Sequence, residues 1–120
     1  MKIAISAAGK DLDSQVDPRF GRAAGFVIYN TENKTSEYIT NAQNLNAVQG
    51  AGIQSARIIS GTGAKVLITG HCGPKAFTAL KAAGIKIFPG ADGTVREAIM
   101  KLATDNLAEA AGADVAGHWA

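Results

Sequence analysis

The chain has 120 residues, of which 47% are hydrophobic and 18% charged, and these values are typical of one folded domain. Its net charge of +2 is too small to indicate nucleic-acid or membrane binding. A single cysteine excludes an intramolecular disulfide and a multi-cysteine metal site within one chain, and a free thiol is typical of a reducing compartment. Because the sequence also shows no signal peptide and no membrane span, we expect a cytoplasmic protein with no nucleic-acid or membrane partner.

The first third of the chain predicts three strands and one long loop. Residues 2–8 (KIAISAA) form an apolar run that Gly9 stops, as in a buried strand. Residues 8–24 show no periodicity, and a loop of this length inside a compact domain is often functional. Residues 26–30 and 35–40 predict two strands, which the turn-forming sequence TENK joins into a hairpin.

The rest of the chain predicts helices over 52–60, 74–84 and 94–107, with apolar strands over 65–70 and 85–90 between them. Their ends carry typical signals, namely Gly61 and Gly63 after the first helix, Pro74 and Gly84 in the second, and Thr94 before the third. The side chains expected to face the core are Ile53, Ala56 and Ile59 on the first helix, Phe77, Leu80 and Ala83 on the second, and Val95, Ile99, Met100 and Leu102 on the third.

This order of elements predicts an α/β layered sandwich. The hairpin is expected at one edge of the sheet, and the three uniformly apolar strands are expected to be parallel and central. Parallel sheets bind ligands at the carboxyl ends of their strands, so the loops over 8–24, 69–74 and 89–94 should converge on one site. We place a single domain at 1–108 and a flexible tail at 109–120.

The stretch TGHCGP (69–74) puts the only cysteine next to a histidine, immediately before a predicted helix. The first N–H groups of a helix are unpaired and carry the positive end of its dipole, so this start, with Lys75 in the first turn, predicts an anion pocket. Gly73 lets a ligand approach the backbone. Cys72 is a candidate thiolate that faces this pocket, and alternation along the strand then turns His71 away from it. Alternatively, Cys72 is a small buried hydrophobic residue and His71 lies at the surface.

A second cluster of candidate residues lies in the long loop, in the stretch VDPRFGRAAG. Arg19 and Arg22 flank Phe20, and Gly21 permits a bend. Two guanidinium groups with an aromatic ring between them suit an anionic ligand with a polarizable face. Alternatively, the two arginines form surface ion pairs with neighbouring aspartates.

The loop over 89–94 repeats the arrangement of glycines before a helix start, and Arg96 lies in the first turn of that helix. Arg96 is therefore a further candidate for anion binding. No nucleotide-binding fingerprint occurs, because GTGAKV connects a helix to a strand and no Walker-type sequence is present.

The chain resembles the dinitrogenase iron–molybdenum cofactor biosynthesis family (the NifX/NafY group) in four stretches, which are DPRFGRAAGFVIY, GAGIQSA, GHCGPKAFTALKAAGIKIF and GTVREAI. The resemblance covers residues 1 to about 103. Within the family, GKDLDSQVDPRFGRA and GHCGP are most similar to the orange-protein branch of sulfate-reducing bacteria. The resemblance implies a ribonuclease-H-like three-layer sandwich with three helices and a five-stranded mixed sheet, in the order 3-2-1-4-5 with strand 2 antiparallel.

The resemblance also implies that the protein binds, carries or assembles an anionic metal–sulfur cluster without catalysis. The cluster is an iron–molybdenum cofactor precursor in the nitrogenase branch and a molybdenum–copper–sulfide cluster in the orange-protein branch. We expect the molybdenum–copper–sulfide cluster, with the apo form after heterologous expression, and as partners the cytoplasmic proteins that supply or receive it. The residues expected to bind it are Arg19, Phe20, Gly21, Arg22, His71, Cys72, Gly73, Lys75 and Arg96, with Cys72 as the candidate metal ligand.

Two other classes of function are weighed against a cluster carrier. Nucleases and phosphotransferases of this fold hold Mg²⁺ with carboxylates on the central strands, and KIAISAA and KVLITG contain none. We therefore expect no enzyme. The alternative is a regulatory or interaction module that binds a small anion or a protein through the same loops. Visible colour distinguishes the two, because a metal–sulfide cluster absorbs visible light.

Overall fold

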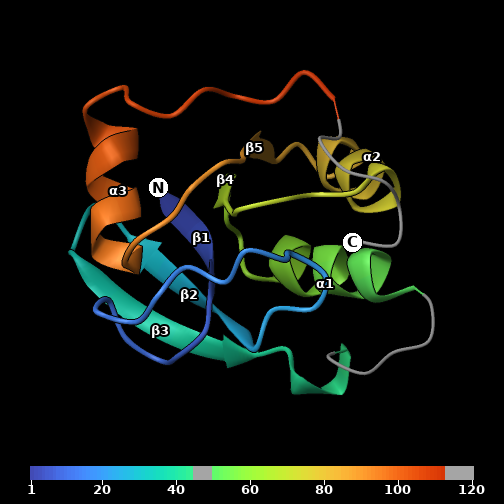
Figure 1. Ribbon diagram of the computed structural model, residues 1–120, viewed down its shortest axis with the longest axis horizontal. Coiled ribbons are helices and arrows are strands. Elements are labelled where there is room, and N and C mark those ends of the chain that lie inside the picture. The colour runs from blue at the N-terminus through green and yellow to red at the C-terminus, as the bar shows by residue number, and fades with distance from the viewer. Residues whose placement is uncertain (45–49, 113–120) are drawn as a thin grey trace.

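The computed structural model describes residues 1–44 and 50–112 and has a five-stranded sheet between two layers of helices (Figure 1). The strands lie in the order β3-β2-β1-β4-β5; β1 is antiparallel to β2 and parallel to β4. This confirms the predicted fold class. The elements are β1 (Lys2–Ala7), β2 (Gly25–Asn30), β3 (Thr35–Thr40), a 3₁₀ helix (Ala42–Asn44), α1 (Ala51–Gly61), β4 (Val66–Ile68), α2 (Pro74–Ala82), β5 (Lys86–Phe88) and α3 (Val95–Ala103).

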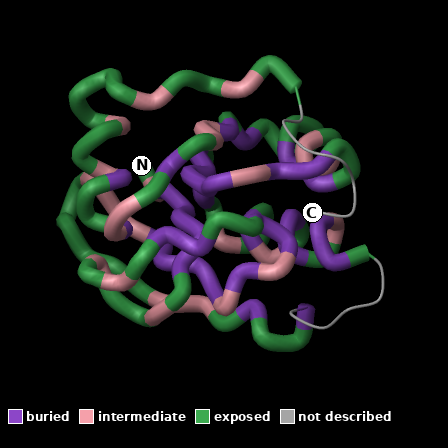
Figure 2. Tube along the Cα trace, viewed as in Figure 1, coloured by how far each residue is buried: buried purple, intermediate pink, exposed green. Residues whose placement is uncertain are grey.

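The central strand β1 divides the hydrophobic core into two parts, because its side chains alternate between the two faces of the sheet. Ala4 belongs to a cluster that α1 and α2 cover, and Ile3 and Ile5 belong to a cluster that α3 covers. Figure 2 shows the resulting distribution, with buried residues in the centre and exposed residues along the outer turns. The helix pair and α3 therefore lie on opposite faces of the sheet.

The position of β5 corrects one prediction. The apolar pattern alone predicted that all three apolar strands are central, but β5 pairs only with β4 and forms an edge of the sheet, as the order 3-2-1-4-5 implied by the resemblance requires. The chain after α3 runs along this edge, where the Ala110 N–H donates a 2.8 Å hydrogen bond to the Ile87 carbonyl. This contact involves the first residues of the predicted tail; residues 113–120 lie outside the described part, so the tail's flexibility stays a prediction.

The ends of α3 differ in how well the sequence predicted them. Thr94 caps its N-terminus as expected, since its hydroxyl accepts a 3.1 Å hydrogen bond from the Glu97 N–H. The helix ends at Ala103 instead of 107, and Asp105 has a left-handed φ of 60° that ends the helical path. Met100 was expected to face inward in part, but it is 62% exposed. Ala83, the C-cap of α2, was expected to face the core and is exposed as well.

No helix in the ranges 1–44 and 50–112 is long and apolar enough to cross a membrane.

Candidate functional site

The long loop after β1 is held by hydrogen bonds at the end of the sheet where the parallel strands have their carboxyl ends. The Val16 N–H donates a 2.8 Å hydrogen bond to the Gly93 carbonyl in the loop before α3. The carboxylate of Asp17, only 9% exposed, accepts hydrogen bonds of 3.2 Å from the backbone N–H groups of Arg19 and Ala24. A buried carboxylate thus fixes the turn that carries both arginines.

Arg19 and His71 are paired across two segments that are distant in sequence. The His71 N–H donates to the Pro18 carbonyl at 2.8 Å, and the Phe20 N–H donates to the His71 carbonyl at 3.2 Å. Paired residues of such a ladder point to the same face, so the Arg19 and His71 side chains lie on one face. Arg19 is exposed and His71 half-buried.

The same pairing turns Phe20 and Cys72 into the core. Phe20 is fully buried, with its ring centroid 5.5 Å from that of Phe26, and Cys72 is 1% exposed within the same cluster. We expected Cys72 to face the ligand, but its side chain is buried, as in the alternative in which Cys72 is a small hydrophobic residue, because pairing with the loop sets the alternation after β4. The role of Cys72 as a metal ligand, which the sequence suggested, would require this part of the core to open.

Gly21 connects the arginine loop to α1. Its carbonyl oxygen accepts hydrogen bonds from the Asn41 side-chain amide at 3.2 Å and from the Ser55 hydroxyl at 3.1 Å. Asn41 and Ser55 are fully buried, and sequence analysis missed both of them. The only sequence signal was a serine on the core-facing side of a helix. Arg22, the residue after Gly21, is half-buried.

The N-terminus of α2 offers unused hydrogen-bond donors. Gly73 is its N-cap and provides no side-chain cap, and Pro74 has no N–H. Within the described part of the chain, the N–H groups of Lys75 and Ala76 donate to no residue. The N-cap of α1, Gly50, also provides no side-chain cap. At both helix starts, therefore, no capping side chain accepts hydrogen bonds from the first N–H groups or offsets the positive end of the helix dipole.

These two helix starts are neighbours. Ile53 in the first turn of α1 and Pro74 and Lys75 in the first turn of α2 line the same groove. The structure thus brings two helix N-termini close to the backbone segments that carry four basic residues. We call this set the basic site; its side chains are Arg19, Arg22, His71 and Lys75.

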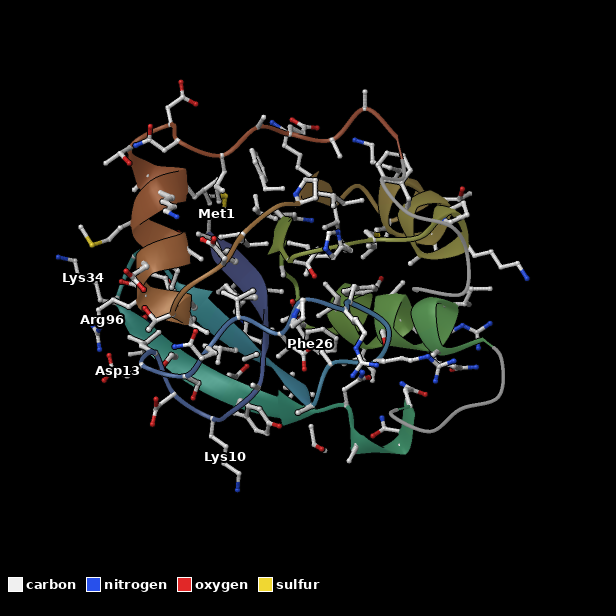
Figure 3. The ribbon with its side chains drawn as sticks, in the orientation of Figure 1. Met1, Lys10, Asp13, Phe26, Lys34 and Arg96 are labelled. Carbon is white, nitrogen blue, oxygen red and sulfur yellow. The ribbon has the colours of Figure 1, made fainter. Side chains whose placement is uncertain are left out.

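Arg96 lies apart from the basic site, on the opposite face of the sheet. The N–H groups of Val95 and Arg96 donate to carbonyls of the long loop at 2.9 and 2.8 Å, so the N-terminus of α3 has its donors occupied. The Arg96 guanidinium pairs with Asp13 at 3.1 Å, and Figure 3 shows both residues at the α3 side of the molecule. The structure does not bring Arg96 together with the other candidates.

The residues of the basic site suit an anion better than a bare metal ion. Among the described residues, no group of three or more histidine, cysteine, aspartate or glutamate side chains could hold a metal. The site offers N–H donors and positive charge at its surface, with the only cysteine buried behind it. Such an arrangement binds negative charge without forming metal–protein bonds.

The order of strands and helices places the chain in the ribonuclease-H-like α/β class. The sequence profile described as dinitrogenase iron–molybdenum cofactor matches residues 1–105, so the chain belongs to this family, as its four stretches predicted. It is 32% identical over 102 residues to an uncharacterised protein of Methanocaldococcus jannaschii, with 82% of each chain covered.

Solved structures of similar proteins agree with this assignment. The apo form of the orange protein from Desulfovibrio gigas is 44% identical, with a TM-score of 0.93 over 95% of this chain and 96% of that one. A NifB-like protein from Thermotoga is 38% identical, with a TM-score of 0.79 over 90% and 91% of the two chains.

Proposed function

We propose that this protein binds and carries an anionic metal–sulfur cluster at the basic site and catalyses no reaction. The observation that carries the proposal is the pair of neighbouring helix N-termini, with N–H groups of Lys75 and Ala76 that donate to no described residue. Helix starts bind anions because their N–H groups point outward and the dipole favours negative charge. Arg19 and Arg22 add donors and positive charge beside them, and His71 adds a ring N–H donor.

The donor set fits a cluster that brings its own sulfides. Such a cluster needs N–H donors and counter-charges, and it does not need several cysteines from the protein. Lys75 and the two arginines would balance its charge, while the Lys75 and Ala76 N–H groups would donate to its sulfur atoms. The buried position of Cys72 agrees with binding that is chiefly electrostatic.

For the cargo we propose a molybdenum–copper–sulfide cluster. The proposal is supported by the 44% identity to the orange protein and by the GHCGP and DPRFGRA stretches that predicted this branch of the family. The protein would then work in the cytoplasm, together with the proteins that supply or receive the cluster.

Loading the apo protein anaerobically with tetrathiomolybdate and Cu(I) tests the proposal. After gel filtration, we expect visible absorption and bound molybdenum and copper. Replacing Arg19 and Arg22 together with alanine should lower the affinity about 100-fold or more, because each charge-assisted hydrogen bond contributes about 1.5–3 kcal/mol. Arg96→Ala is the matched control, since it removes an arginine from the opposite face, and we expect it to bind normally.

Two outcomes would contradict the proposal. A wild-type protein that emerges colourless and metal-free would favour the alternative, a module that binds a small anion or a protein partner without a cluster. A double arginine variant that binds as well as the wild type would remove the basic site from the binding mechanism. Metal and sulfide analysis of protein purified anaerobically from its native source would then identify the natural cargo, if any.

A further inference from the structure

A groove between α1 and α2 begins at the basic site and continues away from it. Its volume is about 560 Å³, and it is lined by Ile53, Pro74, Lys75, Thr78, Ala79 and Ala82. The four lining residues from Lys75 to Ala82 follow the i, i+3, i+4, i+7 spacing of one helix face. Ala76 and Leu80, on the other face of α2, are fully buried against the sheet. The groove is therefore a second, mostly apolar face of the helix pair.

The two helices that form this groove contain basic but no acidic residues, and the carboxylate of Glu109, from the segment after α3, pairs with Lys81 of α2 at 3.5 Å. Residues 38–91, which include both helices, contain no aspartate or glutamate, although the whole chain has ten. Lys75 lies in the groove, and Arg57, one turn after Ile53 on α1, lines the neighbouring hollow beside the 3₁₀ helix. Both are exposed, and neither forms an ion pair with another described residue. An apolar groove flanked by cations is complementary to an apolar ridge flanked by carboxylates.

We propose that this groove docks an acidic amphipathic helix of the protein that supplies or receives the cluster; the proposal rests on the proposed carrier function. A groove between two helices accepts the apolar face of a third helix, whose anchors repeat every three or four residues. The nine residues of α2 span about 13 Å, or about two and a half helical turns. A second copy of this chain is a poor occupant, because its own groove face is also cationic.

The position of the groove explains why a carrier would dock its partner there. The groove starts at the first turns of α1 and α2, where the cluster is proposed to bind. A partner helix in the groove would therefore lie beside the cluster. The cluster could then pass between the two proteins without being released into water.

Site-specific photo-crosslinking in the native source tests the choice of surface. A benzophenone amino acid replaces Thr78 in the groove, and a matched variant carries it at Ser36, which is exposed on the edge strand β3. We expect a discrete crosslinked protein only from position 78, with a crosslinked segment that forms an amphipathic helix rich in Asp and Glu. Equal crosslinks from both positions would overturn the proposal. So would no crosslink, or a basic segment, a second copy of this chain or nucleic acid at position 78.

A peptide of the crosslinked segment then tests the charge complementarity on the apo protein. Ala82→Glu puts a carboxylate at the exposed end of the groove far from the basic site, and we expect it to raise the Kd of the peptide at least tenfold. Arg57→Glu should weaken binding similarly, and a peptide with Lys in place of its facing Glu should restore it. Unchanged affinity in both variants, or no rescue, would overturn the proposal.

The failure of this inference can be distinguished from the failure of the carrier function. Cluster loading is measured by absorption, and Ala82→Glu should load like the wild type because Ala82 lies outside the basic site. If the variant loads normally and still binds the peptide, the docking surface is wrong and the carrier function stands. If the wild type never loads, the carrier function fails, whatever the peptide does.

Discussion

The hydroxyl of Ser55 in α1 lies 3.1 Å from the carbonyl oxygen of Gly21, in the loop that carries both arginines. It also lies 3.1 Å from the side-chain oxygen of Asn41, whose amide donates to the same carbonyl at 3.2 Å. All three residues are buried. The arginine loop and the helix α1 therefore keep a fixed relative position, which the basic site requires because both contribute to it.

Ser55→Ala should destabilise the protein by about 1 kcal/mol. The loss is that of one buried hydrogen bond, because Gly21 and Asn41 each keep another donor. Urea denaturation measures the change, and amide exchange of residues 20–24 should become faster. Ser60→Ala, at an exposed position of the same helix, is the control. Equal stability of the two variants would show that the hydrogen bond from Ser55 to the Gly21 carbonyl does not hold the loop.

Gly70→Ala should destabilise the protein by about 1–3 kcal/mol, since it forces a backbone shift in a packed region. A Cβ atom on Gly70 would lie 2.6 Å from the Cα and the carbonyl oxygen of Pro18, where the arginine loop crosses the end of β4. Gly61→Ala is the matched control, because among the described residues no atom outside its own stretch of helix lies within 4 Å of its Cβ position, and alanine should stabilise the helix by about 0.5–1 kcal/mol. Similar thermal unfolding of both variants would contradict the close approach.

Local patterns in the sequence predicted the strands and helices well, because strands and helices differ in the spacing of their apolar residues. They could not show which apolar strand lies at an edge. β5 is such an edge, and a segment after α3 that donates to Ile87 runs along it. The orientation of Met100 was predictable, however: Val95, Ile99 and Leu102 form one stripe, and Met100 does not continue it.

The candidate site was harder to predict, because its geometry depends on contacts between distant segments. The starts of α2 and α3 look alike in sequence, each with glycines before it and a basic residue in the first turn. The structure separates them: the long loop occupies the N–H groups of Val95 and Arg96, whereas Lys75 and Ala76 donate to no described residue. Likewise, the inward orientation of Cys72 follows from the Arg19–His71 pairing, which no local pattern contains.

The thiol of Cys72 should react slowly with iodoacetamide in the folded apo protein and quickly in denaturant. The residue is 1% exposed, so alkylation requires local opening of the cluster around Phe20. Mass spectrometry gives an unambiguous rate because the chain has no second cysteine. Fast reaction in the native state would place the sulfur at the surface.

Cys72→Ala should still take up the cluster, because the basic site provides the binding groups and the sulfur lies behind it. Its visible absorption after loading should match that of the wild type, whereas the double arginine variant should load poorly. Removing the sulfur atom, so that a methyl group replaces the CH₂SH side chain, leaves only a small cavity, and the variant should therefore fold. If Cys72→Ala cannot hold the cluster while the double arginine variant can, a metal–thiolate bond holds it, and the core opens on binding.

The capping box of α3 should make stability depend on pH through Glu97. The Thr94 N–H donates to Glu97 Oε1 at 2.8 Å and, with the Thr94 side chain, holds the pKa of Glu97 below its ordinary value of 4.5. The folded protein therefore binds this proton less tightly than the unfolded chain. The ionised carboxylate contributes stability above pH 4.5, and this contribution is lost as the pH falls through the lowered pKa.

Glu97→Gln should accordingly be less stable than the wild type at neutral pH, and the difference should disappear as the pH falls below 4.5. The variant keeps the shape of the side chain and an oxygen that can accept from the Thr94 N–H, so only the charge is tested. Urea denaturation at a series of pH values measures the difference, and Glu37→Gln, which removes an exposed carboxylate from β3, controls for the change in net charge. A difference that stays constant from neutral to acidic pH would show that the charge of Glu97 does not stabilise the helix start.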